Sequence, residues 1–107
     1  GKYKTLMLVL TGDMFSAEDA ERAGLVSTLT DEGQALPQAL LIAQKISRLP
    51  PLAVEQIKEA VVNGEDAPLE TALRLERKAF QLLFDTADKR EGIAAFLEKR
   101  KPSFKGR

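Results

Sequence analysis

Apolar residues recur along most of the chain at the spacing of an α-helix. Positions three and four apart lie on one face of a helix, so each run predicts a helix with an apolar face. The runs cover residues 3–10, 16–23, 36–46, 51–63, 68–84 and 86–97. The segment 25–29 alternates apolar and polar residues and is a candidate for a brief extended segment. The pattern therefore predicts an all-α chain of about six helices with at most one very short strand.

Residues at the ends of these runs supply the expected start and stop signals. Gly12 is placed to end the first helix in a left-handed cap, and Gly64 to close the fourth. Ser16 followed three residues later by Asp19 has the form of a capping box. Thr86 is placed to cap the last helix. These signals agree with the periodicity and support the helical assignment.

Several predicted helices are short or carry wide apolar faces, so they cannot all cover one another. Phe80, Phe84 and Phe96 occur at helical spacings and are expected to be core or interface aromatics. Apolar surface left over on a soluble chain usually marks an interface. We therefore expect these helices to pack against something else.

The composition narrows the possible functions. The 107 residues amount to one domain, and equal numbers of basic and acidic residues, 16 each, argue against a general nucleic-acid or membrane-surface binder. Cysteine and histidine are absent, which excludes thiolate nucleophiles and removes the commonest metal ligand. No apolar stretch reaches the roughly 18 residues of a membrane span, and no signal peptide is visible. We expect a cytoplasmic protein without a metal or cofactor.

Motifs that carry chemistry are scarce. The chain has no glycine-rich phosphate loop, metal-ligand cluster or nucleophile elbow. Glu91 and Glu98 are seven residues apart on the last predicted helix, and we interpret them as a solvated or ion-paired surface. No residue of this chain is therefore predicted to be catalytic.

The end of the last helix combines apolar and cationic residues. Phe96 and Leu97 are followed by a single acid, Glu98, and then by a cluster of cations: Lys99, Arg100, Lys101, Lys105 and Arg107. Cations in a last turn interact favourably with the helix dipole and solubilise a tail. Alternatively, Lys99 or Arg100 meets a phosphate while Phe96 contacts the apolar part of the ligand.

Three segments, in this order and spacing, resemble the carboxy-terminal part of the enoyl-CoA hydratase/isomerase, or crotonase, family. They are LTGDMFSAEDAERAGLVS (10–27), PPLAVEQIKEAV (50–61) and DKREGIAAFLEKRKPSFKG (88–106). The resemblance covers practically the whole chain. It implies that residues 1–107 form the small helical C-terminal domain of the crotonase fold, which serves oligomerisation and covers the active site. It also implies that the catalytic α/β core precedes this chain and is absent from it.

The resemblance implies a parent enzyme, an enoyl-CoA hydratase (a lyase) or a related isomerase. In this family two glutamates and two backbone N–H groups of the core perform the addition of water to a trans-2-enoyl-CoA thioester. The 107 residues alone are therefore expected to be inactive. Phe96 and Lys99 match positions that contact acyl-CoA, and the expected assembly is a homo-oligomer, a trimer or a dimer of trimers. The alternative is a free-standing helical interaction module whose basic tail binds an acidic partner or nucleic acid.

Overall fold

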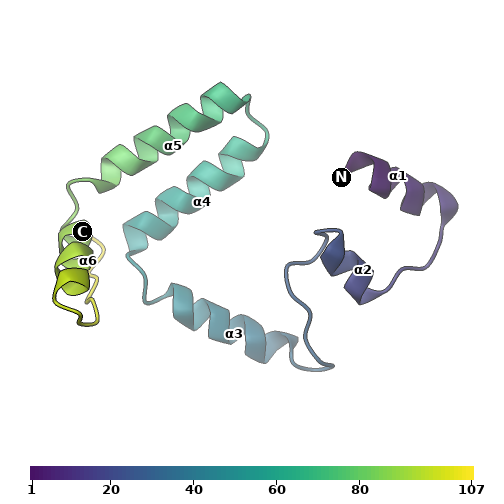
Figure 1. Cartoon of the computed structure of the whole chain (residues 1–107), viewed down its shortest axis with the longest axis horizontal. Helices are drawn as coiled ribbons and strands as arrows, with labels where there is room; N and C mark the ends of the chain where they lie inside the picture. The colour runs from purple at the N-terminus through teal and green to yellow at the C-terminus, as the bar shows by residue number, and fades with distance from the viewer. The chain divides into compact units, whose positions relative to one another are not determined.

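The computed structural model describes all residues, 1–107, and contains six α-helices and no strand (Figure 1). The helices are α1 Lys2–Thr11, α2 Ala17–Arg22, α3 Ala35–Ile46, α4 Pro51–Glu65, α5 Leu69–Leu83 and α6 Ala87–Leu97. Residues 25–29 form bends and irregular backbone, so the candidate extended segment does not become a strand. The prediction of an all-α chain of six helices is confirmed.

Most of the predicted end signals act as expected. Gly12 adopts φ 68° after α1, and its N–H donates to the carbonyl of Leu8. Ser16 and Asp19 form both hydrogen bonds of a capping box at the start of α2. The hydroxyl of Thr86 accepts the N–H of Lys89 at 3.1 Å and so caps α6.

The predicted end of the fourth helix is wrong. Gly64 lies inside α4, which continues to Glu65 and is capped at Asp66. A Cβ atom at position 64 would lie 3.5 Å from the Cβ of Ala72 in α5. The glycine therefore sits where two helices approach closely, and it is not in a left-handed cap.

The chain divides into two compact units, residues 1–41 and 42–107. The first contains α1, α2 and the start of α3, and the second contains the rest of α3 and helices α4 to α6. Within the second unit, α4 and α5 form an antiparallel hairpin whose helices lie side by side in Figure 1. Small residues at their contact, including the buried Ala79, allow this approach.

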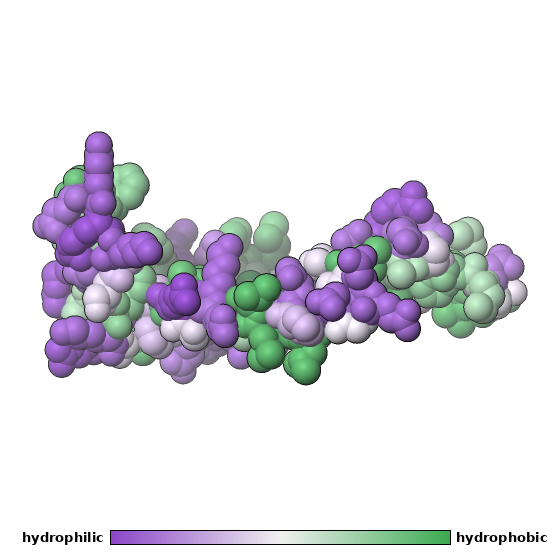
Figure 2. Space-filling view, turned by 90° about the horizontal axis from the view of Figure 1, so that it is seen from below, coloured by the Kyte–Doolittle hydropathy of each residue, from purple (hydrophilic) through white to green (hydrophobic).

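The buried core of the chain contains no large side chain. Its buried hydrophobic residues are all alanines: Ala20, Ala79 and Ala95. In contrast, Met14 is 99% exposed and Phe80 is 63% exposed, and apolar residues reach the face seen in Figure 2 between polar ones. The prediction of surplus apolar surface is confirmed, and Phe80 and Phe84 are not core residues of this chain. No helix is both long and apolar enough to cross a bilayer.

Candidate functional site

The turn after α6 places a lysine in a backbone conformation that usually requires glycine. The N–H of Arg100 donates to the carbonyl of Ala95 at 3.0 Å, and the N–H of Lys99 donates to that of Phe96 at 3.3 Å. These two bonds form a Schellman motif, in which the residue after the C-cap is left-handed. That residue is Lys99, with φ 53°, and no other non-glycine residue of the chain has a positive φ.

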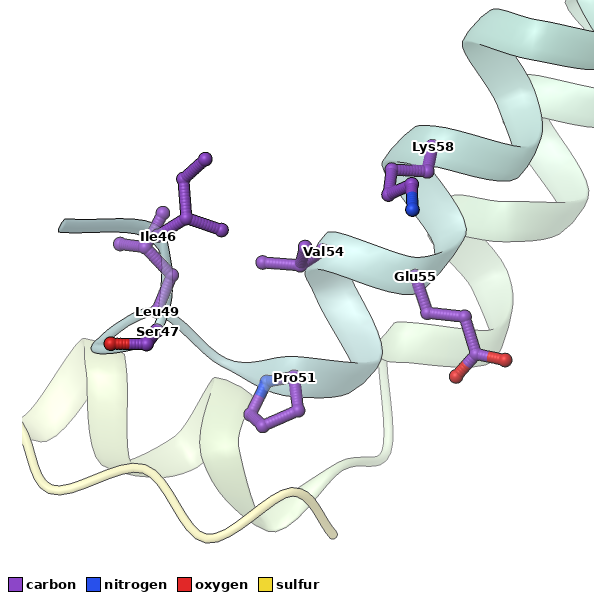
Figure 3. Close-up of a pocket in the computed structure, with 7 residues that line it drawn as sticks. All are labelled: Ile46, Ser47, Leu49, Pro51, Val54, Glu55 and Lys58. Carbon is purple, nitrogen blue, oxygen red and sulfur yellow. The ribbon is translucent and has the colours of Figure 1, made fainter. Parts of the chain in front are cut away.

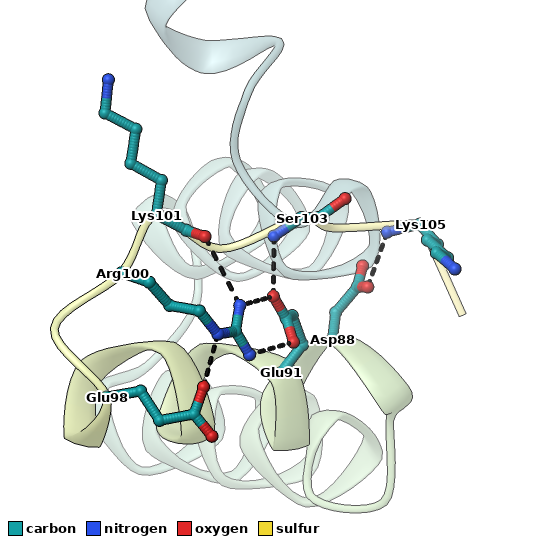
Figure 4. A network of polar contacts seen from close by, with 7 residues as sticks. All are labelled: Asp88, Glu91, Glu98, Arg100, Lys101, Ser103 and Lys105. Carbon is teal, nitrogen blue, oxygen red and sulfur yellow. Dashed lines mark hydrogen bonds and ion pairs between the residues drawn. The ribbon is translucent and has the colours of Figure 1, made fainter.

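Arg100 is held by two carboxylates, so its charge is neutralised locally (Figure 4). Its Nη1 and Nη2 donate to Oε1 and Oε2 of Glu91 at 2.6 and 2.9 Å, which is a bidentate pair. Its Nε donates to Oε2 of Glu98 at 2.5 Å. The hydrogen bond from Arg100, aided by the backbone N–H of Ser103, lowers the pKa of Glu91 to about 2. The two carboxylates in turn raise the pKa of Arg100.

The prediction that Glu91 and Glu98 form an ion-paired surface is thus confirmed, with Arg100 as their shared partner. Only one quarter of the Glu91 side chain is exposed, 25%, against 59% for Glu98. The bond from Arg100 to Glu91 spans the second half of α6 and the turn that follows it, whereas the bond to Glu98 spans only Lys99.

The tail beyond this turn folds back along α6 and is anchored at a buried carboxylate. Asp88 is 3% exposed and accepts the backbone N–H groups of Lys105 at 2.7 Å and Gly106 at 2.8 Å. Its own N–H donates to the carbonyl of Arg107 at 3.1 Å. Phe104 lies against Gly92, where a Cβ atom would be 3.5 Å from its ring. Residues 98–107, called the return tail below, are therefore fixed to both ends of α6.

The two predicted contact residues both lie at the C-terminal end of α6. Phe96 is 83% exposed, and Lys99 is exposed one turn later and makes no ion pair. Arg100, the other candidate for an anion, is occupied by Glu91 and Glu98. Of these two cations, Lys99 is therefore the one whose charged group has no ion-pair partner.

Sequence reasoning missed the roles of Asp88 and Arg100. An acid in the first turn of a helix, where Asp88 lies, is usually explained by the helix dipole, but the carboxylate of Asp88 binds the return tail. The signal was present in the spacing of Asp88 and Glu91, one turn apart and therefore on one face of the helix.

A hollow lies where α3 leads into α4, and its character differs from that of the end of α6 (Figure 3). It has a volume of about 400 Å³ and is lined mainly by apolar side chains, among them Ile46, Leu49 and Val54. Glu55 and Lys58 are the charged residues of its lining. Nothing in it pairs a nucleophile with a base, and no acidic cluster in the chain has the arrangement of a metal site.

Comparison with known proteins gives one consistent family. A model of the enoyl-CoA hydratase/isomerase family matches residues 1–107. The 2,3-dehydroadipyl-CoA hydratase of Escherichia coli (strain K12) is 42% identical over 107 residues, which are 100% of this chain and 42% of the relative. A probable enoyl-CoA hydratase of Rhizobium meliloti (strain 1021) is 46% identical over 107 residues, which are again 100% of this chain and 42% of the relative.

A solved structure agrees with these sequence relatives. The crystal structure of an enoyl-CoA hydratase from Bacillus anthracis superposes with a TM-score of 0.87 at 38% identity, over 97% of this chain and 40% of that one. The chain thus spans about two-fifths of the length of the curated relatives it matches.

Proposed function

The chain belongs to the enoyl-CoA hydratase/isomerase family, and from that premise we propose that it forms the helical C-terminal region of an enoyl-CoA hydratase. In this proposal the whole protein adds water to a trans-2-enoyl-CoA thioester, and residues 1–107 cover the acyl-CoA site and take part in homo-oligomer contacts. The reacting groups belong to a part of the protein outside these residues.

The observation that carries this proposal is the absence of any large buried side chain in a chain with many exposed apolar ones. Burying apolar surface is the main favourable term in folding, at roughly 25 cal/mol per Å². Helices that bury only alanines gain little from it, so they need another body to cover residues such as Leu10, Met14 and Phe80. The remaining three-fifths of the relatives' length would supply such a body.

The end of α6 is the proposed contact with substrate. Acyl-CoA joins an apolar acyl and pantetheine arm to a nucleotide that carries phosphates. Phe96 offers an exposed aromatic surface to the arm, and the unpaired ammonium of Lys99 offers a cation to a phosphate. The interaction-module alternative is not favoured, because the family match covers the whole chain and Arg100 is withdrawn from the basic tail by two carboxylates.

A chimeric enzyme tests the proposal. Residues 1–107 would replace the matching portion of the Escherichia coli 2,3-dehydroadipyl-CoA hydratase, and hydration would be followed by loss of enoyl-thioester absorbance. We expect turnover by the chimera and by the intact relative. We expect none from the relative cut before this portion, and none from residues 1–107 alone.

Turnover by residues 1–107 alone would contradict the placement of the chemistry. A chimera that folds and assembles like the intact relative, yet is as inactive as the truncated one, would contradict the proposed role of these helices. Size-exclusion chromatography with light scattering on the same samples reports whether this chain supports oligomer formation.

A further inference from the structure

Lys99 adopts a left-handed backbone conformation that is unusual for a lysine. Glycine is the usual residue at the left-handed position of a Schellman motif, because a Cβ atom crowds the following carbonyl. Here the position holds a lysine with φ 53°. A strained residue persists only where its surroundings fix it, and such residues cluster at functional sites.

The surroundings that fix Lys99 are the side chains of its two neighbours in sequence. Glu98 precedes it and Arg100 follows it. The hydrogen bond between these two side chains, 2.5 Å from Nε to Oε2, closes a ring of atoms that includes the backbone of Lys99. Arg100 is also tied to Glu91 in α6 by two bonds of 2.6 and 2.9 Å. Arg100 therefore connects both sides of the left-handed residue to the helix.

The same bonds leave Lys99, and not Arg100, without an ion-pair partner. All three nitrogens of the guanidinium group donate to Glu91 or Glu98, while the ammonium of Lys99 has no ion-pair partner. A left-handed residue also departs from the path of a further helical turn, so Lys99 does not extend the face of α6. Arg100 thus sets the backbone direction from which the neighbouring ammonium group leaves.

We propose that Arg100 is a positioning residue that acts through Lys99, holding the Lys99 ammonium where it meets a phosphate of the CoA nucleotide. This rests on the proposed function, and it adds a role for Arg100 that does not involve contact with the substrate. The clamp formed by Glu91, Glu98 and Arg100 selects the left-handed turn before the substrate arrives, which lowers the ordering cost of binding.

The test uses the full-length protein that carries this chain and two substrates with the same enoyl group. One substrate is the CoA thioester, and the other is the pantetheine thioester, which lacks the nucleotide. The variants are Lys99→Gln, Arg100→Gln and the double variant. Arg90→Gln is the matched control, because Arg90 is an exposed arginine of α6 whose ion pair, with Asp85 at 3.3 Å, lies away from the turn.

Lys99→Gln should raise the KM for the CoA thioester roughly tenfold with kcat unchanged, the loss expected for about one charge-assisted hydrogen bond. Arg100→Gln should give a rise of the same kind, about threefold to tenfold, and neither variant should change the KM for the pantetheine thioester. If Arg100 acts through Lys99, the double variant should match Lys99→Gln alone, because the second change removes nothing further. Arg90→Gln should behave as the unmodified protein.

Two results would overturn the positioning role while leaving the phosphate contact of Lys99 in place. One is a double variant in which the two rises multiply, which means that Arg100 acts independently. The other is an Arg100→Gln variant that leaves both KM values unchanged or impairs both substrates equally. A Lys99→Gln variant without selectivity would instead refute the phosphate contact itself, whereas the chimera reports separately on the family function.

Arg100→Lys and Glu98→Gln provide the same readout if Arg100→Gln does not fold. A lysine keeps the charge but cannot bridge two carboxylates in a fixed fork, so Arg100→Lys should raise the KM only for the CoA thioester. Glu98→Gln weakens the bond across Lys99 and leaves the bidentate pair with Glu91, and it should give a smaller rise of the same selectivity. Unchanged kinetics in both variants would refute the proposal.

Discussion

Replacing Lys99 with glycine should make the protein more stable and its binding of CoA thioesters weaker. The left-handed conformation costs an L-residue roughly 1–2 kcal/mol, and glycine adopts it without that cost. Glycine loses more backbone freedom on folding, which offsets roughly 0.5–1 kcal/mol of the gain. With φ at 53° in the folded state, the net stabilisation should be about 0.5–1 kcal/mol. For a protein of 150–250 residues this raises Tm by about 1–4 °C.

The assay is thermal unfolding of the full-length protein, paired with KM for the CoA thioester. Lys101→Gly is the matched control, because Lys101 is also an exposed lysine of the return tail but does not have a positive φ. The control should show an unchanged or lower Tm, since glycine there only adds freedom to the unfolded chain. A Lys99→Gly variant whose Tm is no higher than that of the unmodified protein would refute the argument that position 99 is strained.

Three other changes test separate parts of the structure. Asp88→Ala removes the acceptor of two backbone N–H groups at a buried site, so it should lower the free energy of unfolding by about 3 kcal/mol and speed amide exchange in residues 103–107; unchanged exchange would show that the tail is held elsewhere. Because the pKa of Glu91 is about 2 in the folded state and 4.5 is its ordinary value, its stabilising effect is complete above about pH 4.5 and is lost as the pH falls toward 2. Glu91→Gln should therefore flatten the decline of Tm over that interval, and an equally steep decline would contradict the ion pair. Phe80→Ala should cost about 3–5 kcal/mol in the full-length protein if other parts bury the ring, and retained stability there would place Phe80 on the outer surface.

Local signals allowed the helices to be predicted from sequence. A capping hydroxyl such as that of Ser16 or Thr86 acts on backbone groups within three residues, so its effect does not depend on the rest of the fold. The end of α4 is predicted wrongly because a glycine that ends a helix and a glycine inside a helix next to a neighbouring helix look alike in sequence. Only the position of Ala72 separates the two.

The candidate site could be predicted only in part, because its bonds join residues far apart in sequence. The resemblance pointed to Phe96 and Lys99, and their contacts with substrate stay predictions. The bond between Glu91 and Arg100 spans nine residues and the bond from Gly106 to Asp88 spans 18, and both depend on the reversal of the chain after α6. A lysine at a left-handed position gives no warning of that reversal, since glycine is the residue that usually signals it.

The central claim is that the rest of a larger enzyme covers the apolar surfaces of these helices. The most direct measurement is amide hydrogen exchange of α5 in the full-length protein and in isolated residues 1–107 under identical conditions. Covering predicts that the hydrogen-bonded α5 amides, residues 72–83, exchange only through global unfolding in the full-length protein and exchange rapidly in the isolated chain. Equal protection of α5 in the two samples would show that these helices are stable without a cover, and would contradict the account.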